Sequence, residues 1–312
     1  MPKGLSVHIG LNHVDPAGYG GWDGTLSGCI NDAHHMEAIA TAEGYRTSLL
    51  IDRQATAAAV LAEIRAAAEK LTAGDEFLLS YAGYGGQIED RDEDESKGFD
   101  ETWVCWDRQL LDDEVRAALA GFRADVRILV ISDSCHAGTL IRHPLAPSPP
   151  VRTPDGARRA RLMPAAVANA DAVSRGVTYA RARRNARAEV RRAMAQLGTL
   201  TRRQAELRKG SACLASRVVL MSSCQDNEVG YDGPGNGAFT AALLTVWDRG
   251  RFAGSHRDFL AAIRARLLVQ TPSYLAIGRG NAAWEDSRPF TIDITRDLRP
   301  ANDDQSATAT NR

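Results

Sequence analysis

The hydrophobic pattern alternates between short apolar runs and longer amphipathic segments along most of the chain. Runs rich in Val, Ile and Leu predict strands at Leu5 to Leu11, Tyr45 to Ile51, Asp75 to Tyr81, Thr102 to Trp106, Val126 to Ser132, Arg217 to Ser223 and Ser273 to Ile277. Amphipathic segments predict helices near Gly28 to Gly44, Thr56 to Leu71, Asp112 to Phe122, Phe239 to Trp247 and His256 to Leu268. Because strands and helices alternate, the pattern predicts an α/β protein with a doubly wound, mostly parallel sheet.

The segment Val126 to Ser132 is a nearly unbroken apolar run rich in Val and Ile, which is typical of a strand buried on both faces of a parallel sheet. It is followed at once by Asp133 and Cys135, so a carboxylate and a thiol stand where the strand ends. Open α/β sheets bind their ligands at this carboxyl edge. The alternative is an inert structural cysteine, since free Cys is among the most buried residue types.

The composition changes sharply in the middle of the chain. Five prolines between Pro144 and Pro154 predict an extended linker. From Arg158 to Lys209 the chain is rich in Ala and Arg, which predicts an exposed helical insert. We therefore divide the chain into residues 1–143, the linker and insert at 144–210, a region at 211–295 that completes the same sheet, and a disordered tail at 296–312.

The totals exclude several classes of protein. The formal net charge of −1 gives no overall signal for nucleic acid or for a membrane surface, and no stretch reaches the roughly 18 apolar residues of a membrane helix. The beginning of the chain lacks the apolar core of a signal peptide. Five cysteines without paired spacing favour reduced thiols. We expect a soluble cytoplasmic protein.

Several motifs together resemble those of the caspase-like cysteine peptidases, most closely the bacterial metacaspases. They are the glycine turn AGYGGQ after a strand, DSCHAG, SSCQDNEVGYDGPGNGAFTAALL, GCINDA, DETW and LLDDE. The resemblance covers Leu5 to Leu140 and Arg217 to Ile294. It implies a caspase-like fold, in which helices flank both faces of a mostly parallel six-stranded sheet.

The resemblance implies a cysteine endopeptidase that cuts after Arg or Lys. It assigns the nucleophile to Cys135 and the oxyanion hole to the backbone N–H groups of Gly85 and Cys135. The general base of the family, a His, is replaced here by Tyr84. Because a phenol has a pKa near 10, it is a poor base for a thiol at neutral pH. We expect weak or conditional proteolysis, and the alternative is an inactive pseudopeptidase that binds basic peptides.

Other histidines are weaker candidates for the base. His13 follows the first strand and is expected at the carboxyl edge, whereas His136 adjoins the thiol and is predicted to point away from it. His34, His35 and His256 lie on predicted helices and are expected at the surface.

The resemblance also implies a pocket for a basic side chain. It assigns Asp32 and Asp133 as the acidic pair, with Cys29 and Ala82 beside them, because two carboxylates can hold one guanidinium by charge-assisted hydrogen bonds. The expected partner is a polypeptide with Arg or Lys, including the chain's own basic insert as a tethered pseudosubstrate. We expect no membrane partner and do not favour nucleic acid, since Ala–Arg helices are often only solvated surface.

The chemistry requires no cofactor, but many members of the resembling group bind calcium. The matching carboxylates here are Asp100, Asp112 and Asp113, and hard oxygen ligands suit this ion. Some members carry a further acidic residue seven positions after the cysteine, and this position is Arg142 in this chain. The acidic residues are therefore open to a second interpretation, that of a solvated charge run.

Overall fold

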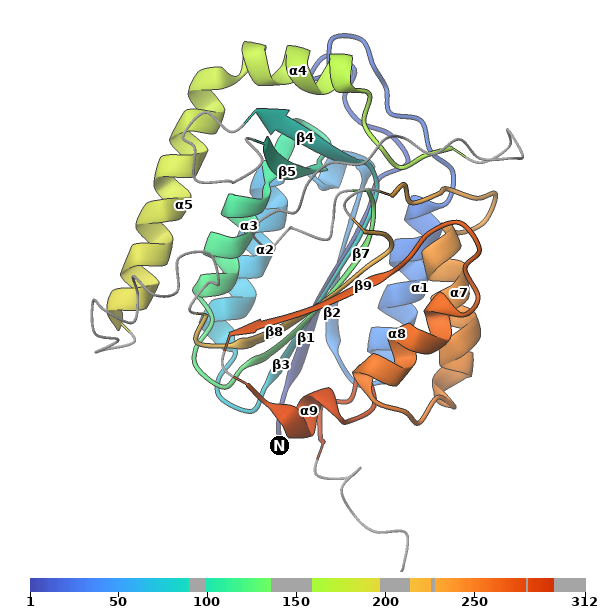
Figure 1. Ribbon diagram of the computed structural model, residues 1–312. Coiled ribbons are helices and arrows are strands. Elements are labelled where there is room, and N and C mark those ends of the chain that lie inside the picture. Colours follow the sequence, from blue (N-terminus) through green and yellow to red (C-terminus); the bar gives the residue numbers. More distant parts are fainter. Residues whose placement is uncertain (90–98, 136–158, 197–213, 226–227, 279, 295–312) are drawn as a thin grey trace, which may run out of the picture.

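Figure 1 shows the computed structural model, which describes residues 1–89, 99–135, 159–196, 214–225, 228–278 and 280–294. The main sheet has the strand order β2-β1-β3-β7-β8-β9. Its strands are β1 (Gly4–Gly10), β2 (Arg46–Ile51), β3 (Glu76–Ala82), β7 (Arg127–Asp133), β8 (Arg217–Ser222) and β9 (Ser273–Gly278). All neighbours pair in parallel except β9, which runs antiparallel to β8. The predicted six-stranded, mostly parallel sheet is confirmed.

Strand β7 lies in the middle of this sheet and is buried along its whole length. Ile128 and Val130 pack into the hydrophobic cluster on one face, whereas Leu129 and Ile131 pack into the cluster on the other. This alternation follows from the two-residue period of a strand. The nearly continuous apolar run in the sequence therefore reflects two buried faces.

Helices cover both faces of the sheet (Figure 1). Apolar residues of α1 (Cys29–Ala42), α7 (Ala238–Trp247) and α8 (His256–Arg264) join one cluster, and those of α2 (Ala57–Lys70) and α3 (Asp112–Ala120) join the other. The remaining short helices are Asp52–Gln54, Asp248–Gly250 and α9 (Ala282–Glu285). Within the described residues, no helix combines the length and apolarity needed to cross a membrane.

A second, three-stranded sheet was only partly predicted. It consists of β4 (Gly85–Glu89), β5 (Phe99–Val104) and β6 (Gln109–Leu111), which pair antiparallel. The sequence predicted one strand, Thr102 to Trp106, and treated Ala82 to Gln87 as a turn. The glycine-rich start of β4 carries little strand propensity, so its pairing with β5 decides its conformation.

The insert forms the helices α4 (Ala165–Ser174) and α5 (Gly176–Gln196), as predicted in part. The expectation that it is exposed is wrong for one face of α5, because Tyr179 and Ala182 are buried against Ile88 and Leu111. The expectation of helix from Arg158 onward is also wrong, because the residues before α4 are extended and bridge to two other segments.

His256 corrects another expectation. It is fully buried rather than at the surface, its ring nitrogen Nδ1 is hydrogen-bonded to the Ser287 carbonyl, and the ring packs against Trp284. The helix period alone could not show this, because α8 is covered on this side by a segment that follows it in the chain.

Candidate active site

The site begins where three neighbouring strands end. Gly10, Ala82 and Asp133 are aligned in the register of β1, β3 and β7. Ala82 also accepts a hydrogen bond from Leu11 at the start of the next loop. Cys135 follows β7 by two residues and is only 1 % exposed. The thiol therefore lies at the carboxyl edge that the apolar run predicted.

A buried acidic pocket lies beside this thiol and contains the side chain of Arg161. The Arg161 Nη2 atom is 2.6 Å from Asp32 Oδ2 and 3.0 Å from Asp232 Oδ1, and Nη1 is 3.0 Å from Asp133 Oδ2. The Arg161 side chain is 0 % exposed. Asp32 and Asp133 thus lie together around one guanidinium, and Asp232 adds a third carboxylate.

Electrostatics in this pocket depend on the guanidinium. Burial raises the pKa of Asp133 to about 6, although Arg161 opposes this rise. The pKa of Asp232 is lowered: burial acts upward, but Arg161 and hydrogen bonds from Ser27 act downward and prevail. Burial raises the pKa of the neighbouring Cys29 thiol well above its usual range, and Arg161 again acts in the opposite direction. Without a cation, three carboxylates would share one poorly solvated space.

Local hydrogen bonds fix the two predicted carboxylates. The Asn12 side chain accepts hydrogen bonds from the first N–H groups of α1, which places Asp32 in the first turn. Asp133 Oδ2 accepts hydrogen bonds from both the backbone and the hydroxyl of Thr240. At Gly237 a Cβ would lie 2.3 Å from Asp133 Oδ2 and 2.6 Å from Arg161 Cζ, so the pocket has no room for a side chain there.

The backbone of Arg161 is held as closely as its side chain. Its carbonyl oxygen accepts hydrogen bonds from Gly85 N at 2.9 Å and Cys135 N at 3.3 Å. These are the two N–H groups that the resemblance assigned to the oxyanion hole. A Cβ on Gly85 would lie 1.7 Å from the Cys135 carbonyl oxygen, so this close approach requires glycine.

We call the extended residues Arg159 to Met163 the strap. Five backbone hydrogen bonds tie it into the cleft on both sides. Besides those of Gly85 N and Cys135 N to the Arg161 carbonyl, they are Arg161 N to the Gly230 carbonyl, Met163 N to the Gly85 carbonyl and Asp232 N to the Arg159 carbonyl. The strap is therefore bound as an added strand, which is how sheet edges commonly bind extended peptides.

The described contacts of Tyr84 are made with other groups than the Cys135 thiol. Its hydroxyl donates a hydrogen bond to the Thr25 carbonyl at 3.3 Å, and its ring packs against Trp22 with centroids 4.8 Å apart. Burial raises the pKa of Tyr84 to about 12, with Arg159 acting in the opposite direction. The phenol is therefore protonated at neutral pH and cannot remove the thiol proton.

The sulfur of Cys135 has other neighbours. Gly230 N donates a hydrogen bond to Cys135 Sγ at 3.1 Å. The pKa of Cys224 is raised well above its usual range, most strongly by a hydrogen bond with Cys135 and next by burial. No hydrogen bond joins Tyr84 to Cys135 among the described residues.

The histidines that the sequence offered as bases do not reach the thiol through any described contact. His13 is exposed, and its influence is on Asp23, whose pKa is lowered first by a hydrogen bond with Thr25 and also by the charge of His13. His34 and His35 are exposed. His136 lies outside the described residues.

The carboxylates expected to bind calcium are already engaged. Asp100 is hydrogen-bonded by Arg183, and Asp113 is paired with Arg116. Asp112 Oδ1 accepts a hydrogen bond from the Asp113 backbone. Among the described residues, no group of three or more His, Cys, Asp or Glu side chains is arranged to hold a metal ion. The described arrangement thus does not fit the implied ion.

Two pocket residues were missed from the sequence. Asp232 lies in the SSCQDNEVGYDGP motif, whose acids could have been tested as pocket candidates. Arg161 is one of many arginines in the insert, and nothing local distinguishes it. Only the folded chain brings it to the pocket.

Comparison with known proteins shows the family to which this fold belongs. The family profile described as "Caspase domain" matches residues 4–280. This chain belongs to the caspase-domain family. Metacaspase-1 of Mycosarcoma maydis is 27% identical over 265 residues, which cover 79% of this chain and 63% of that protein. Metacaspase-1A of Aspergillus clavatus is 34% identical over 157 residues, which cover 46% of this chain and 35% of that protein.

The caspase-domain chain therefore spans less than two thirds of the length of these curated relatives. Among solved structures, it is similar to protein GSU0716 from Geobacter sulfurreducens, with 39% identity and a TM-score of 0.72. That match covers 93% of this chain and 99% of the other. The relatives support the fold and the family over nearly the whole chain.

Proposed function

We propose that this protein is a cysteine endopeptidase that accepts Arg or Lys before the scissile bond and is weak or conditional in activity. One observation carries the proposal: the guanidinium of Arg161 lies among three carboxylates while its carbonyl faces the N–H groups of Gly85 and Cys135. This combination of side chain and backbone contacts is what a bound substrate residue requires.

The reaction would begin when the Cys135 thiolate attacks the carbonyl carbon of the basic residue. Negative charge would develop on the carbonyl oxygen, which the Gly85 and Cys135 N–H groups can stabilise. The scissile C–N bond would then break, the leaving amine would take a proton, and water would hydrolyse the thioester. Tyr84 can donate a hydrogen bond but cannot serve as base at neutral pH, so we expect slow turnover.

The pocket chemistry favours Arg over Lys. A guanidinium presents two terminal nitrogens, and in the strap one contacts Asp133 while the other contacts Asp32 and Asp232. A Lys ammonium offers a single nitrogen, so it cannot reproduce this divided pattern. We therefore expect basic selectivity in which Arg is preferred.

The strap is proposed as a tethered pseudosubstrate. Because the strap belongs to the same chain as the pocket, its effective concentration there is in the millimolar range. Burial of the thiol and the five backbone hydrogen bonds of the strap support an occupied, inhibited cleft. The cytoplasm remains the expected compartment, supported by the free thiols of the four described cysteines.

A second candidate is a pseudopeptidase that binds basic segments without cutting them. The position of Tyr84 favours it, because the hydroxyl contacts the Thr25 carbonyl rather than the thiol. Both candidates share the acidic pocket and differ only in turnover.

The test uses Arg161→Gln, which removes the charge that holds the strap. Fluorogenic peptides ending in Arg, Lys or Asp before the reporter are incubated with this variant and with its Cys135→Ala derivative. Turnover of the Arg peptide that is lost in the Cys135→Ala derivative supports the peptidase. Binding of the Arg peptide without such turnover supports the pseudopeptidase, and preference for Asp contradicts both.

A further inference from the structure

The carboxylate of Asp100 is held by an arginine from the insert. Arg183 lies on α5, and both Nε, at 2.8 Å, and Nη2 donate to Asp100 Oδ2. The same Nη2 donates to the Glu89 carbonyl at 3.0 Å. The Arg183 and Asp100 side chains are only 4% and 1% exposed. This is a buried, charge-assisted contact between the insert and the small sheet.

We propose that Arg183 takes the place of the divalent cation that the family resemblance implies, so that this protein needs no calcium to fold or to form its cleft. A buried carboxylate requires a compensating charge. A guanidinium supplies it permanently, since it stays protonated at all accessible pH values. Arg116 provides a second positive charge, at Asp113.

The position of Arg183 connects this charge to the cleft. Its two acceptors belong to adjacent strands, because Glu89 ends β4 and Asp100 lies on β5 opposite Ile88. The other end of β4 is Gly85, whose N–H donates to the strap carbonyl. Arg183 is therefore a positioning residue for the hairpin that carries this donor, and only this functional consequence rests on the proposed peptidase activity.

The surrounding contacts make the charge a fixed part of the fold. Tyr179, one turn before Arg183, donates a hydrogen bond to Asp171, and its oxygen accepts one from Gln109 N at 3.2 Å. The adjacent Ala182 is buried against the small sheet. Helix α5 thus presents Arg183 from a packed face, which lowers the entropy that the side chain loses in binding Asp100.

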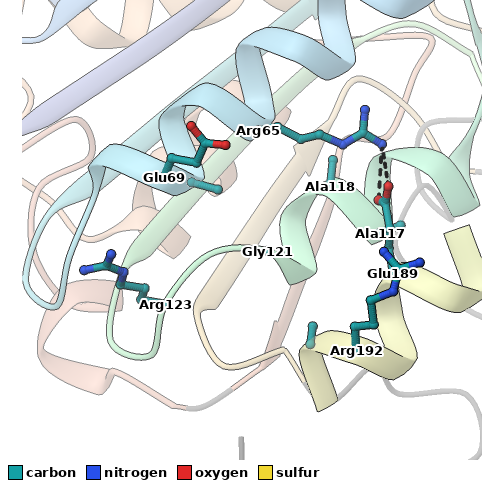
Figure 2. Close-up of a pocket in the computed structure, with 10 residues that line it drawn as sticks. Arg65, Glu69, Ala117, Ala118, Gly121, Arg123, Glu189 and Arg192 are labelled. Atoms are coloured by element: carbon teal, nitrogen blue, oxygen red, sulfur yellow. Dashed lines mark hydrogen bonds and ion pairs between the residues drawn. The ribbon is translucent and has the colours of Figure 1, made fainter. Parts of the chain in front are cut away.

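Another ion pair of the same helix provides a matched control. Figure 2 shows Arg65 of α2 directed toward Glu189 of α5, at the rim of a groove of about 440 Å³ between α2, α3 and α5. Their side chains are 46% and 33% exposed, so this pair contributes little to stability. None of the cleft residues lines this groove. Glu189→Gln therefore removes an ion pair of α5 and leaves Arg183, the proposed replacement for the cation, unchanged.

The experiment follows thermal unfolding of the full chain in chelator, in millimolar CaCl₂ and in MgCl₂. The parent and Glu189→Gln should unfold at the same temperature in all three. Arg183→Gln should unfold about 5 °C or more below the parent in chelator and regain at least half of this loss with calcium. Arg183→Lys retains a positive charge and should remain indifferent to calcium.

A rise in the unfolding temperature of the parent with calcium would overturn the proposal, because the ion would then have its own site. Arg183→Gln that ignores calcium, or that fails to fold with and without it, would also overturn it, since the carboxylates would then be unable to accept a metal. None of these readouts depends on peptidase activity, so failure of the proposed function leaves them unchanged.

Discussion

The two halves of the thiol site differ in what they retain. The binding half has a pocket of three carboxylates and two N–H donors that contact one residue of the strap. The proton-transfer half has Tyr84, whose hydroxyl is directed to the Thr25 carbonyl. In the proposed function, recognition and chemistry are therefore separable, because they depend on different groups.

The two halves differ in how much the stability of the fold depends on them, so substitutions are easier to accommodate in one half than in the other. Removing one partner from a buried ion network leaves uncompensated charge and costs about 3–5 kcal/mol. Tyr84, in contrast, packs on Trp22 and its hydroxyl is hydrogen-bonded locally, so a Tyr at this position leaves its own polar group paired. The free energy of unfolding therefore depends on the pocket residues, whereas a catalytic base would matter only for activity.

The largest expected effect comes from introducing the base that the family resemblance implies. In the Arg161→Gln background, Tyr84→His should raise kcat/KM for Arg peptides by at least roughly tenfold and by up to about 10²–10⁴-fold, which is the contribution of general acid–base catalysis. Steady-state hydrolysis measures this effect, and Tyr84→Phe is the control that keeps the ring and should give no gain. A well-folded Tyr84→His protein with unchanged activity would show that more than the base is missing.

The next effect concerns the strap. Arg161→Gln should speed alkylation of Cys135 by iodoacetamide by roughly 10²–10⁴-fold, because loss of the buried pairs removes about 3–5 kcal/mol of strap binding. Peptide mapping by mass spectrometry identifies the labelled cysteine. Arg159→Gln, on the exposed part of the strap, should leave the rate near that of the parent. Equal rates in all three proteins would mean that Arg161 does not close the cleft.

Asp232 allows a finer test of the binding half. In a protein carrying Arg161→Gln and Cys135→Ala, Asp232→Asn should weaken Arg-peptide binding by roughly 10–10²-fold, because a hydrogen bond to a charged group contributes about 1.5–3 kcal/mol. Fluorescence anisotropy measures the Kd. The exposed Asp248 serves as control, and Asp248→Asn should not change the Kd. An unchanged Kd in Asp232→Asn would remove the third carboxylate from recognition.

The smallest expected effect is the pH dependence. With the guanidinium bound, the Asp133 pKa is about 6, and it must be higher in the empty pocket because Arg161 lowers it. The affinity for Arg peptides should therefore fall, by at most about tenfold per pH unit, as the pH decreases toward 6, and level off below it. The free energy of unfolding should depend on pH in the opposite direction. Because the Asp133 pKa rises from 3.8 to about 6 on folding, the folded protein binds this proton more tightly. The resulting stabilisation is fully present below pH 3.8 and is lost as the pH rises through 6. An affinity that is constant from pH 8 to pH 6 would contradict the assignment.

The sequence by itself determined the main sheet and the position of the thiol. The apolar run before Asp133 specified a strand buried on both faces, and parallel strands bring Gly10, Ala82 and Asp133 to one edge. The phenol at position 84 already indicated a poor base, because its protonation is an intrinsic property of the side chain. Such features depend on local periodicity and on the chemistry of single residues.

Only the tertiary structure decided which charges meet. Asp32, Asp133 and Asp232 come from distant segments, and nothing near Arg161 in the sequence marks it as their partner. Likewise, Arg183 engages a carboxylate that the sequence had suggested for calcium. Long-range pairing is selected by desolvation, since a buried charge tolerates only those partners that the packed chain brings within a few ångströms.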